Sequence, residues 1–300
     1  MQSVVITGAS TGIGWAVAKA LLDRGYRVFG SVRKQADAER LAREFGPSFE
    51  PLIFDVTDEE AVGAAAARVR AALGGRRLAG LINNAGIAVP GPLLYLPIED
   101  FRAQLETNLV GTLIATQAFA PMLGVDEELA GPPGRLINMS SAAGKRALPF
   151  MGPYACSKHG LEAVSESLRR ELMPFGILVC VIGPGAVQSA IWDKAEQVDI
   201  SKYRGTPYAG ILEKARSMMV EGGKRGLPAE MVGRVAYEAL TAPRPQVRYV
   251  LVPNHFQNWI LPKLLPRPVL DRMIAKRLGL DAIGLQKQGL DRPSEARDAA

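Results

Sequence analysis

The sequence predicts an α/β fold, in which one doubly wound domain has a seven-stranded parallel sheet flanked by helices and a C-terminal helical extension follows. Two observations carry this prediction. Short apolar runs rich in β-branched residues alternate along the chain with segments of helical periodicity. The runs are continuous in apolar residues, which is typical of strands that helices cover on both faces. The 300 residues, 48% hydrophobic and 22% charged, suit one globular unit of this kind.

Seven apolar runs are expected to be the strands. Repeated strand–helix units join through right-handed crossovers, so these strands should lie parallel in one sheet. In chain order the runs are residues 3–7, 27–32, 50–54, 80–83, 135–139, 177–182 and 247–252.

Six longer segments have helical periodicity and recognisable ends. The first stops before Gly25, the third opens with Asp-Glu-Glu at the positive end of its dipole, and the last begins at Pro228. In order they are residues 13–24, 36–45, 58–73, 98–122, 154–173 and 228–240.

We expect residues 1–253 to form a single domain. Within it, residues 186–227 are long for a connection, and long connections often cover a site. Trp192, Met218 and Met219 in this connection either line a pocket or pack the segment onto the domain. Residues 254–285 are expected to pack as an extension, on their own domain or on a partner subunit, and the polar residues 286–300 to be disordered.

Composition excludes several classes of protein. Two cysteines and two histidines, with no C-x-x-C pair, argue against a disulfide framework and against a metal site, and favour the cytoplasm. No apolar stretch is long enough for a transmembrane helix, and the first residues do not resemble a signal peptide. The net charge is +6, but the basic residues are scattered in pairs, so no nucleic-acid binding is expected.

A glycine-rich turn follows the first expected strand and opens the first helix. Its sequence, TGASTGIG at residues 7–14, has the spacing G-x-x-x-G-x-G. Glycines let the backbone approach a pyrophosphate, which would bind the amides at the helix start. A tight turn with no ligand is the alternative. The expected contacts with a dinucleotide are Gly8, Ser10, Thr11, Gly12, Ile13 and Gly14.

The end of the second strand should discriminate between the two nicotinamide cofactors. It carries no acidic residue to bind a ribose 2′-hydroxyl, and Arg33 stands there instead. A guanidinium pairs well with a 2′-phosphate, so we expect NADP(H) over NAD(H). The alternative is that Arg33 merely precedes a helix in solvent. Asp55 is expected to accept a hydrogen bond from the adenine amino group, or else to serve only in a turn.

The chain resembles the short-chain dehydrogenases/reductases. The resemblance rests on TGASTGIG, Asp55-Val56, NNAG at 83–86, Asn108, SSAAG at 140–144, YACSK at 154–158 and Pro184-Gly185. It implies a Rossmann fold and hydride transfer with a nicotinamide cofactor. It also implies cofactor contacts from Val56, Asn84, Ala85, Gly86, Tyr154, Lys158, Pro184, Gly185, Val187 and Ser189.

Tyr154 and Lys158 stand four residues apart, so both side chains lie on one face of a helix. A nearby ammonium and an oxidised nicotinamide both favour the phenolate, so Tyr154 can exchange a proton with an alcohol or ketone oxygen. The resemblance implies that Ser141 holds the same oxygen and that Asn108 anchors a water chain to Lys158. It leaves Ser140 a structural role.

The expected activity is that of an NADP(H)-dependent alcohol dehydrogenase or carbonyl reductase. The apolar connection favours a hydrophobic secondary alcohol or ketone as substrate. Loop and tail look like the branch containing retinol, hydroxysteroid and 3-hydroxybutyrate dehydrogenases, and the family likeness implies a homodimer or homotetramer. Two alternatives are a regulator that senses cofactor redox state and an epimerase or dehydratase with a retained cofactor.

Overall fold

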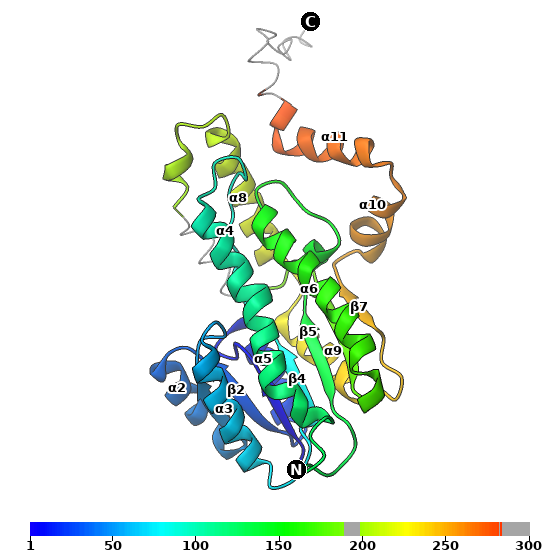
Figure 1. Cartoon of the computed structure of the whole chain (residues 1–300). Coiled ribbons are helices and arrows are strands. Elements are labelled where there is room, and N and C mark those ends of the chain that lie inside the picture. Colours follow the sequence, from blue (N-terminus) through cyan, green and yellow to red (C-terminus); the bar gives the residue numbers. More distant parts are fainter. Residues whose placement is uncertain (189–198, 282, 284–300) are drawn as a thin grey trace, which may run out of the picture.

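The computed structural model describes residues 1–188, 199–281 and 283. In this part of the chain seven strands form one parallel sheet in the order β3-β2-β1-β4-β5-β6-β7 (Figure 1). The predicted fold class is therefore confirmed. The strands are β1 (Ser3–Ile6), β2 (Arg27–Val32), β3 (Phe49–Ile53), β4 (Gly80–Asn83), β5 (Arg135–Met139), β6 (Leu178–Pro184) and β7 (Arg248–Leu251).

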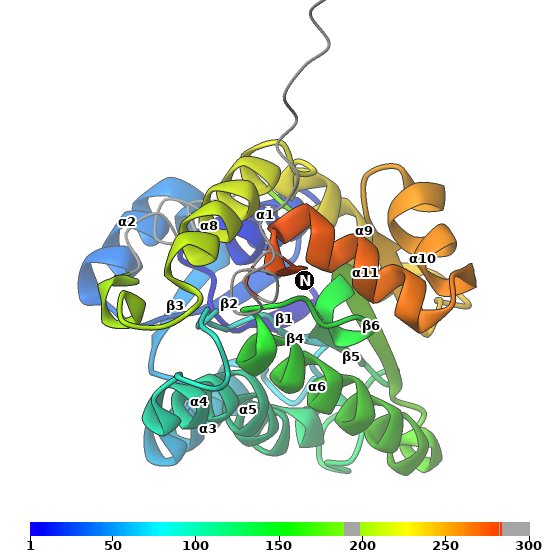
Figure 2. The same ribbon diagram turned by 90° about the horizontal axis from the view of Figure 1, so that it is seen from above.

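Helices cover both faces of the sheet (Figure 2). One layer contains α1 (Gly12–Leu22), α2 (Gln35–Phe45) and α9 (Ala229–Thr241), and the other contains α3 (Glu59–Ala72), α5 (Gly111–Phe119) and α6 (Gly152–Glu171). Neighbouring residues of β1 enter opposite cores, since Val4 and Ile6 pack in the first and Val5 in the second. This two-sided burial explains why the strands read as continuous apolar runs.

The segment expected to be one helix over residues 98–122 is divided. Helix α4 (Ile98–Leu105) leads into a π turn at Glu106–Val110, then α5, then a 3₁₀ turn at Ala120–Leu123. The π turn contains Asn108, which is fully buried and bonded to the backbone of Ile87. A single wide turn of this kind often occurs at functional sites. The prediction of an uninterrupted helix was wrong because side-chain periodicity does not report a local widening of the backbone.

Two further elements lie beyond the carboxyl ends of the strands (Figure 1). The connection after β6 contains a short turn at Ser201–Tyr203 and helix α8 (Ala209–Lys224). The C-terminal extension contains a π turn at Phe256–Ile260, then α10 (Leu261–Leu264) and α11 (Arg267–Leu278). A third apolar cluster joins these segments, because Leu278 and Leu280 pack against the buried side chains of Phe150, Tyr203 and Leu212.

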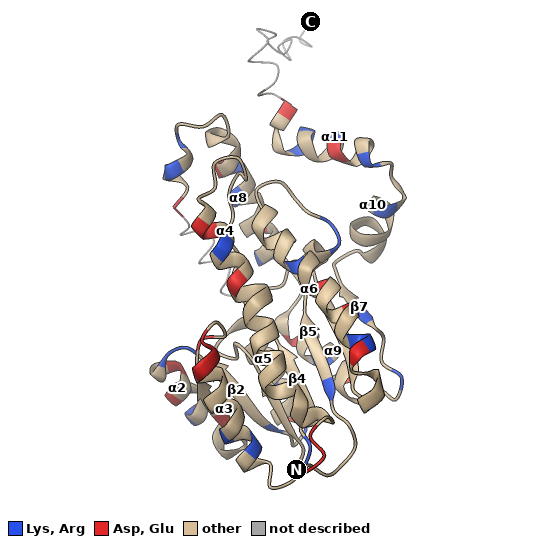
Figure 3. Ribbon diagram, in the orientation of Figure 1, with Lys and Arg blue, Asp and Glu red and all other residues tan. Residues whose placement is uncertain are grey.

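Charged residues lie mainly on the helices and loops, with both signs interspersed (Figure 3). The strands of the sheet are almost free of charge in this view. No helix in the described part of the chain is long and apolar enough to cross a membrane. Within the same residues, no group of three or more His, Cys, Asp or Glu side chains is placed to hold a metal ion.

Candidate active site

The glycine turn between β1 and α1 is one that only glycine can form. Gly8 has a φ of 69°, and a Cβ there would lie 2.9 Å from the Cα of Ala85. A Cβ on Gly14 would lie 2.0 Å from the carbonyl oxygen of Gly8. The first turn of α1 therefore packs directly on the preceding loop, with no room for a side chain between them.

Hydrogen bonds from two neighbouring strands hold this turn. The Asn84 carboxamide, beyond β4, donates to the carbonyl oxygens of Thr7 (3.1 Å) and Gly8 (2.9 Å). The backbone amides of Asn84 and Ala85 both donate to the hydroxyl of Thr7. The Gly8 amide donates to Ser31 Oγ on β2 at 2.9 Å. Sequence reasoning missed Ser31, although a hydroxyl inside an apolar strand was the available signal.

The start of α1 fits an anionic group. Its N-cap, Thr11, makes no side-chain capping hydrogen bond, and no acidic residue stands in the first turn. Amides at the positive end of an eleven-residue helix are good donors to phosphate oxygens. The turn has the shape and the donors that a dinucleotide pyrophosphate requires.

Arg33 and Asp55 lie side by side at the ends of β2 and β3. The Arg33 guanidinium is 3.7 Å from Asp55 Oδ2, and two thirds of its side chain is exposed (67%). Asp55 Oδ1 accepts from the amide and the hydroxyl of Thr57 at 3.1 and 2.9 Å. Asp55 thus makes the turn that the alternative interpretation describes, and its second oxygen faces the arginine.

A second guanidinium, not singled out from the sequence, also reaches this end of the site. Arg40 on α2 donates to the Ser10 carbonyl oxygen at 2.7 Å while pairing with Asp37 and Glu44. The contact joins residues thirty apart in the chain, so spacing within α2 does not reveal it. It brings a second positive charge to the glycine turn.

Ser141, Tyr154 and Lys158 meet where β5 ends and α6 begins. The Lys158 ammonium donates to the Met139 carbonyl oxygen at 2.8 Å and lies 5.8 Å from the centre of the Tyr154 ring. Ser141 Oγ accepts from the Ala143 amide at 3.1 Å and donates to the Pro184 carbonyl oxygen at 3.3 Å. Ser141 and Lys158 are both buried. The helical spacing thus places the phenol and the ammonium on one face, beside the serine.

Burial dominates the ionisation of these groups. It raises the pKa of Tyr154, and the Ser141 side chain acts in the opposite direction. Burial lowers the pKa of Lys158 to about 8, partly opposed by the carboxylate of Glu162. The chain by itself therefore favours the neutral phenol of Tyr154, and the effect of an oxidised nicotinamide on this group stays a prediction.

Asn108 projects from the π turn toward the same helix. Its Oδ1 accepts from the Ile87 amide at 2.8 Å, and its Nδ2 donates to the Ile87 carbonyl oxygen and to Ser157 Oγ. A Cβ on Gly86 would lie 3.1 Å from Asn108 Oδ1. The structure thus places Asn108 against the residue before Lys158, and the water chain stays a prediction.

The segment after β6 closes the site on the other side. Its backbone contacts two other segments of the chain. The Gly185 amide donates to the carbonyl oxygen of Leu251 in β7, and Val187 forms an isolated β-bridge with Leu227, just before α9. Val56 follows β3 and packs closely against Gly111. A Cβ on Gly111 would lie only 2.7 Å from Cγ2 of Val56. Ser189 and Trp192 lie outside the described residues.

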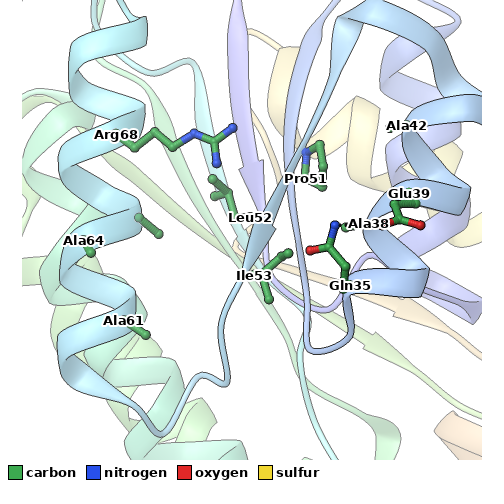
Figure 4. Close-up of a pocket in the computed structure, with 11 residues that line it drawn as sticks. Gln35, Ala38, Glu39, Ala42, Pro51, Leu52, Ile53, Ala61, Ala64 and Arg68 are labelled. Atoms are coloured by element: carbon green, nitrogen blue, oxygen red, sulfur yellow. Dashed lines mark hydrogen bonds between the residues drawn. The ribbon is translucent and has the colours of Figure 1, made fainter.

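One other hollow lies away from these residues. It opens at the edge of the sheet, between α2, α3 and β3 (Figure 4). Its wall is mostly alanine and aliphatic, with Gln35, Glu39 and Arg68 at the rim. It contains no residue of the candidate site.

Comparison with known proteins shows the family that the chain resembles in sequence and fold. A family model described as short chain dehydrogenase matches residues 2–199. The chain is 39% identical to the NADPH-dependent 3-dehydrocapnine reductase of Ornithobacterium rhinotracheale, over 93% of this chain and 98% of the relative. It is 34% identical to retinol dehydrogenase 7 of Rattus norvegicus, over 82% and 79%. A Burkholderia cenocepacia short chain dehydrogenase, solved in complex with NADP, superposes with a TM-score of 0.68 at 26% identity, over 91% and 99%.

Proposed function

Because the chain belongs to the short-chain dehydrogenase family and is thus an oxidoreductase, we propose that it transfers a hydride between NADP(H) and a hydrophobic secondary alcohol or ketone. The observation that carries the proposal is the meeting of Ser141, Tyr154 and Lys158 at the carboxyl end of a parallel sheet. Ligands of open α/β sheets bind at this end.

In this proposal the residues that follow β1 to β6 would hold the cofactor. The glycine turn would hold its pyrophosphate, and Arg33 and Asp55 would hold its adenosine half. The exposed Arg33 guanidinium supports NADP(H), because it can pair with a 2′-phosphate. A relative named as an NADPH-dependent reductase supports the same choice. When bound, the nicotinamide supplies or accepts the hydride.

Three side chains act on the substrate oxygen and its proton. The Tyr154 hydroxyl donates a proton to the ketone oxygen during reduction and accepts one from the alcohol during oxidation. The Ser141 hydroxyl holds the same oxygen. The Lys158 ammonium, held by the Met139 carbonyl, stabilises the phenolate left on Tyr154. Asn108 keeps this part of α6 in place through Ser157.

The substrate pocket is proposed to lie between this site and the segments above it. The apolar cluster of Phe150, Tyr203 and Leu212 supports a hydrophobic substrate. So does the identity with a retinol dehydrogenase. We further propose a cytoplasmic homodimer or homotetramer, with residues 1–253 as its catalytic domain. Val110, just before α5, and Leu113, on α5, are exposed apolar residues and support a subunit contact there. Two free cysteines support a reducing compartment.

The test is oxidation of NADPH, followed at 340 nm, with a panel of hydrophobic ketones and aldehydes and with NADH in parallel. We expect turnover with NADPH. Tyr154→Phe should lower kcat by about a thousandfold, since general acid–base catalysis contributes roughly 10²–10⁴, and should leave NADPH affinity unchanged. Arg33→Asp should move the preference toward NADH, whereas Arg43→Asp, on the exposed end of α2, should not.

Two outcomes would contradict the proposal. Full activity of Tyr154→Phe would remove this residue from its role. NADPH binding without turnover of any ketone or aldehyde, in wild type and variants alike, would support a redox sensor instead.

A further inference from the structure

A buried group of charges lies behind the proposed catalytic serine, and the reaction described above does not use it. Its members are Glu162, one helical turn beyond Lys158 on α6, and Arg248, the first residue of β7. Arg248 Nε donates to both carboxylate oxygens of Glu162, at 3.0 and 3.1 Å. The side chains are only 8% (Glu162) and 15% (Arg248) exposed. Lys145 reaches the same carboxylate from the loop after β5, at 3.2 Å.

The same guanidinium also holds the backbone of Ser141. Arg248 Nη2 donates to the Ser141 carbonyl oxygen at 3.0 Å. One planar group therefore connects the carboxylate of α6 to the residue whose hydroxyl faces Tyr154. Ser141 also has contacts with Ala143 and Gly144 in its own turn and with Pro184 at the end of β6. The Arg248 guanidinium ties it to the far strand β7.

The fit around the pair is close on both sides. A Cβ on Gly183 would lie 2.3 Å from Arg248 Nη2, and a Cβ on Gly144 would lie 3.1 Å from Glu162 Cγ. The indole of Trp259, at the start of the extension, covers the guanidinium with its ring centre 4.9 Å away, and Lys263 lies 3.9 Å from the same ring centre. Arg248 is thus fixed between a strand, a helix and the extension.

Stability alone is a weak reason for such a pair. Desolvating two charges costs about as much as their attraction returns, and apolar replacements of buried pairs are often as stable. Arg248 Nη1 is moreover buried without a hydrogen-bond partner among the described residues. The pair provides two interactions that apolar residues would not. Arg248 donates a hydrogen bond to Ser141, and Glu162 places a negative charge one helical turn from Lys158.

We infer that Glu162 and Arg248 are positioning residues for the proposed reaction: Arg248 fixes Ser141 against the substrate oxygen, and Glu162 fixes Arg248 while placing its negative charge beside Lys158. The inference rests on the roles proposed above for Ser141, Tyr154 and Lys158. The charged and titratable groups around the pair are Lys145, Lys158 and Tyr154, with Lys263 beyond Trp259. Glu162 is the carboxylate that opposes the lowering of the Lys158 pKa by burial.

Two variants separate the two roles. Glu162→Gln keeps the shape but removes the charge, and Arg248→Lys keeps the charge but lacks the planar fork that binds Glu162 and Ser141 at once. Glu166→Gln is the matched control, because Glu166 lies one turn further along α6 in an exposed pair with Arg170. The readouts are kcat and KM for ketone reduction, the pH dependence of kcat, and the melting temperature.

We expect both variants to lower kcat about tenfold or more, because a misplaced reacting group costs up to about a hundredfold, with KM for NADPH within about twofold of wild type. The alkaline limb of kcat should move to lower pH in Glu162→Gln, since Lys158 then loses its proton more readily. It should stay in place in Arg248→Lys and in Glu166→Gln, and Glu166→Gln should keep full activity.

A purely structural role predicts a different pattern. The melting temperature would fall while kcat per folded enzyme and the alkaline limb stayed as in wild type, and this result would overturn the inference. Tyr154→Phe in the same assay separates the two proposals. If it is inactive while the pair variants are normal, only the positioning role fails; if it is active, the proposed function itself fails. Should Glu162→Gln not fold, Arg248→Lys alone still decides whether Ser141 needs its anchor.

Discussion

Lys158 combines two demands that conflict in a single side chain. In the proposed reaction it must carry a charge to support Tyr154, yet it is 5% exposed and its pKa is lowered to about 8. In the unfolded chain a lysine titrates near 10.4. The unfolded state therefore binds more protons than the folded state between these two pH values, and the stability of the folded state rises as pH increases through this window.

This linkage gives a prediction for Lys158→Met. The variant lacks this titration. The free energy of unfolding of wild type, relative to that of the variant, should therefore increase by on the order of 2 kcal/mol between pH 7 and pH 10. Chemical denaturation at both pH values measures the gain. Lys214→Met, on the exposed side of α8, is the control. A gap between wild type and Lys158→Met that does not change with pH would show that the buried ammonium is not destabilised. The variant should also be inactive.

At the residue scale, the sequence predicts best what lies within one element. The spacing of Tyr154 and Lys158 places both on one face of α6, and the structure has them there. The contacts of Ser31, Arg40 and Arg248 join segments far apart in the chain. Nothing in local periodicity reports such contacts, so these residues come only from the fold. The chemical roles of the site residues stay predictions.

At the scale of elements, the glycine turn and α1 act as one rigid unit. Gly14 lies inside the helix and leaves no space above Gly8, whereas Gly63 in α3 faces open space. The same substitution, glycine to alanine inside a helix, should therefore have opposite consequences at the two positions.

We expect Gly14→Ala to raise KM for NADPH about tenfold or more, because a Cβ 2.0 Å from the Gly8 carbonyl must displace the turn. Gly63→Ala should leave KM unchanged and stabilise the protein by about 0.5–1 kcal/mol, since glycine costs that much in a helix. NADPH titration and thermal melting measure the two effects. Equal KM values in the two variants would mean that the turn does not hold the cofactor.

The element boundaries show where sequence reasoning works and where it stops. A capping residue marks the start of α3, whose N-cap Asp58 accepts from the Ala61 amide. The π turn at Glu106–Val110 was missed because its cause is tertiary: a buried carboxamide that bonds the backbone of Ile87. Helix α8 was missed because the connection shows no clear capping residues.

At the scale of the whole molecule, the third apolar cluster joins three distant parts of the chain. Phe150 precedes α6, Tyr203 and Leu212 belong to the connection after β6, and Leu278 ends α11. Phe150 has a φ of 66°, a strained conformation for a bulky residue. The extension therefore packs on the segment proposed to cover the substrate.

Leu278→Ala should loosen this packing without touching the cofactor. We expect KM for a hydrophobic ketone to rise several-fold, because the variant removes a partly buried leucine side chain from the cluster, while KM for NADPH stays as in wild type. Met273→Ala is the control, since Met273 on α11 is 56% exposed. Equal ketone KM values for the two variants would place the extension outside the pocket.

The strand order has a consequence for how the protein is made. The first four strands pair among themselves, and β5, β6 and β7 then join the same open edge one after another. Each new strand of a nascent chain can therefore add to an open edge of the sheet, and no existing strand pair has to separate. The nucleotide-binding end forms early in this order. The guanidinium that anchors Ser141 arrives only with the last strand. Ser141, Tyr154 and Lys158 are all synthesised before β7, so Ser141 receives its contact with Arg248 only after the other residues of the proposed site have been made.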